Sequence, residues 1–118
     1  MSSAGAFLVF AVSTLFAAQA LTAPDESQIA RGQRVYQKWC YPCHGPGMDK
    51  PGTIALEARG VKPGALEERT DMDATAIKMF VRSGVLFMPT FRKTEISNAD
   101  LDDLGAFLTR NAKTAAQK

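Results

Sequence analysis

Five consecutive residues, Cys40, Tyr41, Pro42, Cys43 and His44, constrain this chain more than any other part of its sequence. One turn of backbone carries two thiols that are separated by two residues, and the next residue adds an imidazole. This spacing is the attachment sequence of a c-type haem, in which both thiols bond to the porphyrin and the imidazole binds the iron. The motif therefore predicts one covalently bound haem c held by Cys40, Cys43 and His44.

Other sites built from cysteine fit this chain less well. A thioredoxin-like redox pair has the same cysteine spacing, but it expects a βαβ context and needs no histidine. A structural zinc site needs four ligands, whereas the chain has two cysteines and one histidine. A disulfide between Cys40 and Cys43 remains possible, but so short a loop gains little stability and leaves His44 without a role.

The N-terminal segment predicts export. Residues 4–20 are almost wholly apolar or small and end in Ala18-Gln19-Ala20, which is an A-x-A cleavage pattern. We therefore expect residues 1–20 to be a signal peptide that is cleaved near Ala20, and residues 21–118 to form one domain in the periplasm. No Lys or Arg precedes the apolar run, which departs from the usual signal. Retention as a membrane anchor is the alternative, but the run is short for a membrane span.

Size and charge narrow the remaining classes. The mature chain suffices for one small domain, in which the haem is expected to form part of the core. With 14 basic and 12 acidic side chains the formal net charge is +2, and two haem propionates would cancel it. This balance does not indicate a nucleic acid partner.

Three helical patterns and no alternating strand pattern predict an all-α fold. The first helix begins near Asp25 and leads into the haem motif, the second follows an N-cap at Asp73 and stops at Gly84, and the third starts at Ser97. The apolar residues that recur at helical spacing are Ile29, Tyr36, Trp39, Ile77, Phe80, Val81, Leu101, Leu104 and Leu108. The segments 45–52, 60–64 and 84–89 are rich in Gly and Pro and are expected to be loops around the ligand.

The second axial ligand is expected to be Met88. It lies far from His44 in the sequence, directly before a proline and between two predicted helices, so that it can reach the other face of the iron. Met48 is too close to His44 to cross the porphyrin easily. Met72 at a helix entry and Met79 within a helix are better suited to filling space in the core.

Ligation by His44 and Met88 predicts electron transfer rather than catalysis. A thioether favours ferrous iron and raises the reduction potential. With both axial positions filled by the protein, no coordination position is open to a substrate, so the chain is not expected to be an enzyme in itself. A haem enzyme or ligand sensor is the alternative that would need an open iron.

The order of these motifs over residues 25–111 resembles the class I cytochrome c family. Gly32 with Tyr36 resembles the pair on the first helix of that family, which lets the terminal helix cross closely. The terminal helix of that family carries a matching motif, which is similar to four residues of this chain, namely Leu101, Leu104, Phe107 and Leu108. The resemblance implies about three main helices wrapped around one haem. It also implies that the backbone carbonyl of Pro51 accepts a hydrogen bond from the His44 ring.

Two further expectations concern the haem pocket. Arg59 lies where its planar guanidinium could pair with a haem propionate, although an exposed loop arginine is an equal alternative. Aromatic residues that flank the ligands are expected to line the pocket by packing. These residues are Trp39, Tyr41, Phe80, Phe87 and Phe91.

A finer resemblance suggests partners. Residues 56–60, 80–84 and 88–91 are similar to the cytochrome subunit of p-cresol methylhydroxylase and related phenol-oxidising flavocytochromes. That resemblance implies that a flavoprotein dehydrogenase subunit passes single electrons to this chain. A soluble acceptor such as a copper protein would then receive them. The alternative is a free periplasmic shuttle with the same haem and no tightly bound flavoprotein.

Overall fold

The computed structural model describes residues 24–112 of the chain. This range contains six helical segments that are joined by loops. They are α1 (Glu26–Trp39), α2 (Tyr41–His44), α3 (Pro51–Glu57), the 3-10 helix η1 (Leu66–Glu68), α4 (Ala74–Ser83) and α5 (Asn98–Thr109). Within this range no strand forms, and a single isolated bridge joins Val85 to Met88. The all-α prediction is confirmed. The predicted signal peptide lies outside the described residues.

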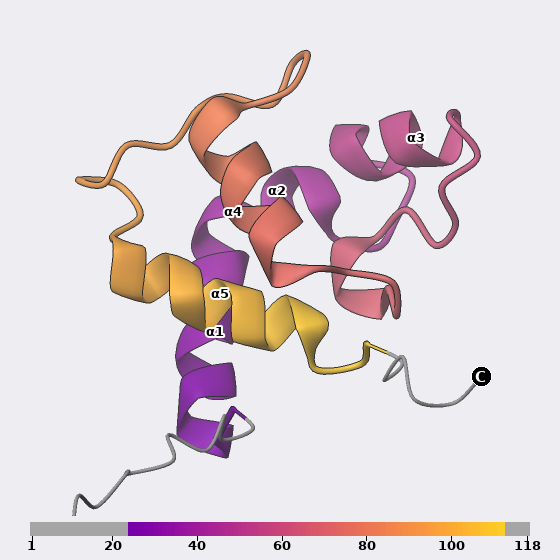
Figure 1. The fold of residues 1–118 in the computed structure, drawn as a ribbon. Helices are drawn as coiled ribbons and strands as arrows, with labels where there is room; N and C mark the ends of the chain where they lie inside the picture. The colour runs from indigo at the N-terminus through magenta and orange to yellow at the C-terminus, as the bar shows by residue number, and fades with distance from the viewer. Residues whose placement is uncertain (1–23, 113–118) are drawn as a thin grey trace, which may run out of the picture.

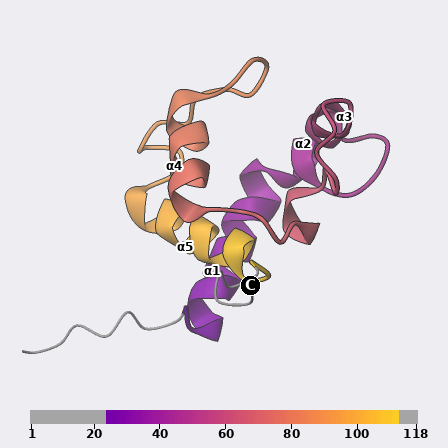
Figure 2. The ribbon, with the colours of Figure 1, turned by 45° about the vertical axis from the view of Figure 1, so that its right-hand side comes forward.

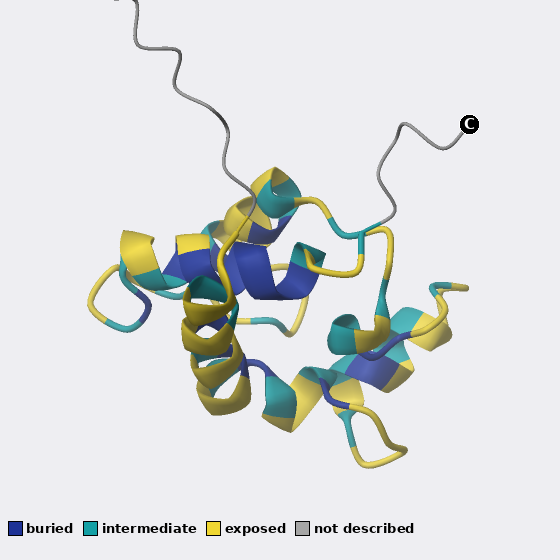
Figure 3. Cartoon of the chain, turned by 90° about the horizontal axis from the view of Figure 1, so that it is seen from below, coloured by how far each residue is buried: buried dark blue, intermediate teal, exposed yellow. Residues whose placement is uncertain are grey.

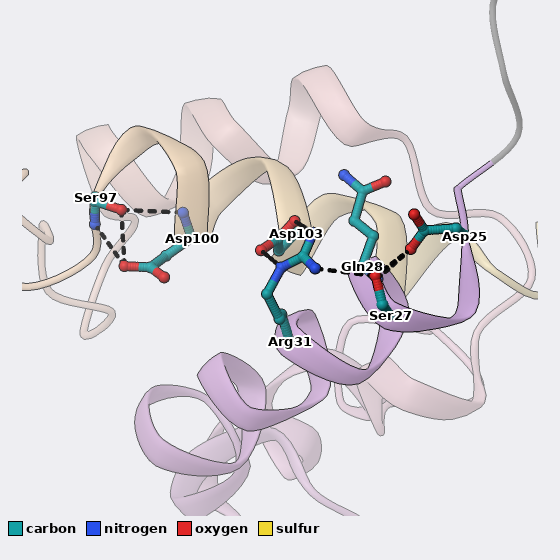
Figure 4. A network of polar contacts seen from close by, with 7 residues as sticks. All are labelled: Asp25, Ser27, Gln28, Arg31, Ser97, Asp100 and Asp103. Atoms are coloured by element: carbon teal, nitrogen blue, oxygen red, sulfur yellow. Dashed lines mark hydrogen bonds and ion pairs between the residues drawn. The ribbon is translucent and has the colours of Figure 1, made fainter.

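The three main helices begin where their capping residues predict. The Asp25 carboxylate accepts a 2.6 Å hydrogen bond from the Gln28 amide at the start of α1. At the start of α4, the Asp73 carboxylate accepts from the Ala76 amide at 2.8 Å. At the start of α5, the Ser97 hydroxyl accepts from the Asp100 amide at 3.0 Å, and the Asp100 carboxylate accepts from the Ser97 amide at 3.3 Å (Figure 4). Each cap satisfies amide groups that have no partner within the helix.

Helix α5 crosses α1 closely and also packs against α4 (Figures 1 and 2). The crossing depends on Gly32, where a Cβ atom would overlap the backbone carbonyl of Asp103 and lie 2.8 Å from the Cβ atom of Phe107. One turn later on α1, the Tyr36 ring packs against the Phe107 ring with 5.3 Å between centroids. The close crossing that the family resemblance implies is therefore present.

The core lies around this crossing, with exposed residues on the outer faces (Figure 3). Tyr36, Ile96 and Leu104 are the largest fully buried side chains. At the edge of the crossing, Arg31 Nε and Nη2 donate to the two carboxylate oxygens of Asp103 at 2.7 and 3.2 Å (Figure 4). This paired geometry fixes α1 against α5 in direction as well as in position.

Three short helices were not predicted from the sequence. Helix α2 is the haem motif itself, and η1 lies between two loops. Helix α3 begins at Pro51, in a segment that was expected to be a loop. A proline at the first helical position loses no hydrogen bond, because that amide has no partner within the helix anyway. Among residues 24–112 no helix is long and apolar enough to span a membrane.

Candidate functional site

A cavity of about 260 Å³ lies where α2, α4 and α5 face the loops that follow α3 and α4. Its walls are mainly apolar, with Leu56, Ile77, Val81, Leu104 and Leu108 among the residues that line it. Three of the residues predicted to hold haem line it as well. They are Cys40, His44 and Met88.

The haem motif forms a single turn that begins as α1 ends. Cys40 caps α1, and its carbonyl oxygen accepts from the amides of Cys43 at 3.1 Å and His44 at 2.8 Å. Cys40 is buried, and this burial raises the pKa of its thiol to about 12. Cys43 is exposed and does not line the cavity. Both cysteines are free thiols, so the structure contains no disulfide between them.

The His44 imidazole lies in tight surroundings. A Cβ atom at Gly52, in the first turn of α3, would approach its Cε1 atom to 2.6 Å and its Nδ1 atom to 2.7 Å. Burial lowers the pKa of the imidazole, which favours the neutral form that binds metals. Its Nδ1 atom is buried and forms no hydrogen bond to any described residue. The His44 side chain lines the apolar cavity, and a neutral imidazole in such a place fits a histidine that binds a metal-bearing group.

The hydrogen bond predicted from His44 to the Pro51 carbonyl is not formed among the described residues. Pro51 begins α3, and the following Gly52 is the residue that lies against the ring. The role of Pro51 therefore remains a prediction. Gly52 was not singled out from the sequence, although a glycine beside a proline soon after the motif is a signal that the backbone approaches another group closely.

Met88 lines the cavity from the loop that follows α4. The loop turns back on itself, since the Met88 amide donates to the Val85 carbonyl at 2.9 Å and the Val85 amide donates to the Met88 carbonyl at 3.2 Å. Met72 lines the same cavity, whereas Met48 and Met79 are exposed and do not. Of the methionines in the described range, the cavity thus contains two, and the choice of Met88 as ligand rests on the sequence.

The two arginines near the cavity differ in position. Arg59 is exposed, its Nη1 atom donates to the Ala55 carbonyl at 3.1 Å, and it does not line the cavity. Arg69, which follows η1, lines the cavity and was not predicted. Its position depends on how η1 packs against α5, and no local pattern in the sequence signals that.

The prediction for the aromatic residues was largely wrong. Only Phe80 of the five lines the cavity. Trp39 and Phe91 instead pack edge to face at 5.8 Å, and Tyr41 packs against Tyr36. Phe87 is fully exposed. Closeness in sequence to a ligand does not decide which way a side chain points.

Comparison with known families agrees with this arrangement. The family model described as Cytochrome C oxidase, cbb3-type, subunit III matches residues 27–108, which is more than half of the chain. The match runs from α1 to α5 and contains the haem motif and Met88. Neither the curated proteins nor the solved structures give a match.

Proposed function

This chain belongs to the family described as cytochrome c oxidase, cbb3-type, subunit III, and on that premise we propose that it is a periplasmic mono-haem cytochrome that carries single electrons. Membership establishes a c-type cytochrome with haem c and a general role in electron transfer. The observation that carries the finer proposal is the single cavity to which Cys40, His44 and Met88 all contribute. Haem bound there supplies reversible one-electron chemistry.

The protein residues determine how readily that electron is accepted. The apolar walls formed by Ile77, Val81 and Leu104 exclude water, which penalises the more highly charged ferric state. The Met88 thioether favours ferrous iron for a different reason, because sulfur is a soft ligand. Both effects raise the reduction potential. Ligation by both His44 and Met88 would leave no position on the iron open for a substrate.

Ligation by Met88 is tested with two matched substitutions in the holoprotein. We expect Met88→Ala to lower the reduction potential and to allow the ferrous protein to bind carbon monoxide, because Met88 would no longer bind the iron. Met72→Leu removes the other thioether of the cavity and should change neither property. If Met88→Ala leaves both unchanged, Met88 is not the ligand. Carbon monoxide binding by the unaltered protein would favour the haem enzyme or sensor instead.

We propose a flavoprotein dehydrogenase subunit as the electron donor and a soluble protein as the acceptor. The resemblance of residues 56–60, 80–84 and 88–91 to the p-cresol methylhydroxylase type supports this assignment. Leu86 and Phe87 support a protein partner in general, since they are 73% and 100% exposed beside the predicted ligand Met88. Large apolar side chains left in water are more often found where a partner binds. The family description, that of an oxidase subunit, favours the alternative of a shuttle towards an oxidase.

Purification from the periplasm of the native host distinguishes these partners. We expect flavin to co-elute with the haem in fixed ratio, and Phe87→Ser to weaken that association while the haem spectrum stays the same. Met48→Ser is the control, because Met48 is also exposed but lies in a different loop. A haem protein that elutes alone at monomer size would support the free shuttle. Sequencing of the mature N-terminus tests export, for which the expected first residue is Leu21.

A further inference from the structure

Arg69 is the one permanently cationic side chain among the described residues that line the cavity. Its side chain is only 16% exposed, although the wall around it is mainly apolar. A guanidinium in such a place must be paired, because an unpaired charge taken out of water is costly.

Part of that pairing comes from Asp71. Arg69 Nε donates to Asp71 Oδ1 at 2.8 Å, and Arg69 Nη2 donates to Asp71 Oδ2 at 2.7 Å. The side-chain hydrogen bond from Arg69 is the main reason that the pKa of Asp71 lies below its usual value, so Asp71 remains a carboxylate. Asp71 is 67% exposed, and it therefore holds the guanidinium from the solvent side.

The Arg69 guanidinium has more N–H donors than Asp71 uses. Of its five N–H groups, the two that point to Asp71 are occupied. The others form no hydrogen bond to a described residue, although Arg69 lines the cavity. The free donors thus belong to a side chain that borders the cavity, where an anionic group could accept from them.

The other charged side chains that line the cavity are negative, so an anion needs the Arg69 guanidinium in order to bind there. Asp71 and Asp73 also line the cavity, and a carboxylate that entered beside them would be repelled. The Asp73 carboxylate is already engaged as the N-cap of α4, where it accepts from the Ala76 amide at 2.8 Å. Arg69 is then the available group that can offset an incoming negative charge.

We propose that Arg69, oriented by Asp71, binds a propionate of the haem at this edge of the cavity. The proposal rests on the proposed function, which places haem between the apolar walls. A haem propionate is a carboxylate on the rim of a flat apolar ring, and a planar guanidinium beside an apolar wall matches its geometry and charge. Leu66 and Ile77 line that wall with Arg69. Arg59, by contrast, is exposed and donates to the Ala55 carbonyl of the preceding helix α3.

The test is the reduction potential of the holoprotein as a function of pH. An ionised propionate stabilises ferric haem, so the potential falls as the pH rises through the propionate pKa. A bound arginine lowers that pKa. Arg69→Leu should therefore move the fall to higher pH by about one to three pH units. Arg69→Lys keeps the positive charge but loses the paired N–H donors of the guanidinium, so it should shift the fall in potential by less.

Two further variants make the result specific. Asp71→Asn removes a competing negative charge and should move the fall to lower pH, opposite to Arg69→Leu. Arg59→Leu is the control and should leave the curve unchanged. The proposal is overturned if Arg69→Leu leaves the curve unchanged, or if Arg59→Leu gives the shift instead. Should Arg69→Leu fail to assemble, opposite shifts in Arg69→Lys and Asp71→Asn support the proposal, and unchanged curves in both overturn it.

The same samples separate this proposal from the proposed function. If the unaltered protein has a covalent haem that does not bind carbon monoxide, the electron carrier stands whatever the pH curves show. If the unaltered protein contains no covalent haem, the proposed function itself is wrong. An Arg69→Leu protein with an unchanged haem spectrum and an unchanged pH curve therefore contradicts only the role of Arg69.

Discussion

The Tyr36 hydroxyl donates a 2.9 Å hydrogen bond to the backbone carbonyl oxygen of His44. Tyr36 is fully buried, and its ring packs against Phe107 at the crossing of α1 and α5. The packed core thus positions the backbone of the residue predicted to bind iron. Stability and ligand geometry depend here on the same side chain.

Replacing Tyr36 by Phe should reduce stability at neutral pH. The substitution keeps the ring in the core but leaves the His44 carbonyl without its donor, which costs about 1–2 kcal/mol in the free energy of unfolding. Denaturant unfolding of the holoprotein measures this loss. Tyr41→Phe is the control, since the Tyr41 hydroxyl forms no hydrogen bond to another described residue and the change should cost less.

The difference between the unaltered protein and Tyr36→Phe should narrow in alkali. Burial is the main cause that raises the pKa of Tyr36 above its ordinary value of 10.0. The unfolded chain releases this proton above pH 10, whereas the folded chain retains it, so stability falls as the pH rises from 10 towards the raised value. Phenylalanine has no such proton. A difference in unfolding free energy that stays constant above pH 10 would contradict this account.

Two glycine substitutions should differ in their effect on stability. Gly32→Ala places a Cβ atom against the backbone of Asp103, and the two helices must move apart at a cost of about 1–3 kcal/mol. Gly105→Ala puts its Cβ atom 3.5 Å from that of Ala74, an ordinary contact. It should be neutral or stabilise α5 by up to about 1 kcal/mol. Thermal unfolding of both variants tests the crossing, and equal effects would argue against it.

Loss of the haem should unfold most of the chain. The cavity of about 260 Å³ is bordered by α2, α4 and α5 of a small domain, and without haem its apolar walls would lack a packing partner. We expect the double variant Cys40→Ala, Cys43→Ala to be largely unfolded by circular dichroism. Full helicity in the absence of haem would show that the cavity is stable while empty.

Leu86 has a φ of 53°, in the left-handed region that residues other than glycine and asparagine rarely adopt. Leu86→Asn should therefore stabilise the holoprotein by about 1 kcal/mol, because the strain is relieved and little buried surface is lost. Phe87→Asn is the control, since the neighbouring Phe87 is also exposed but has no positive φ. A similar gain from both variants would attribute the effect to surface polarity rather than to strain.

Local chemistry in the sequence determined where the main helices begin and what the chain binds. Asp25, Asp73 and Ser97 cap helices through amides three residues away, so the signal and the structure lie in the same short segment. The haem motif is equally local, since it occupies one helical turn. The start of α3 was missed because Pro51 and Gly52 are as typical of a loop as of a helix start.

Only the tertiary structure decided which side chains face the cavity. Arg69 lines it while Arg59 does not, and Phe80 lines it while Phe87 is in water. Arg69, Arg59 and Phe87 reach or miss the cavity through the folding of loops, whereas Phe80 reaches it through the packing of α4. Such contacts depend on packing between whole elements, whereas caps and motifs depend on neighbouring backbone. The sequence by itself therefore identified the ligand-binding turn. The packing of α4 and α5 determined the walls of the cavity, and the segment between η1 and α4 determined its charge.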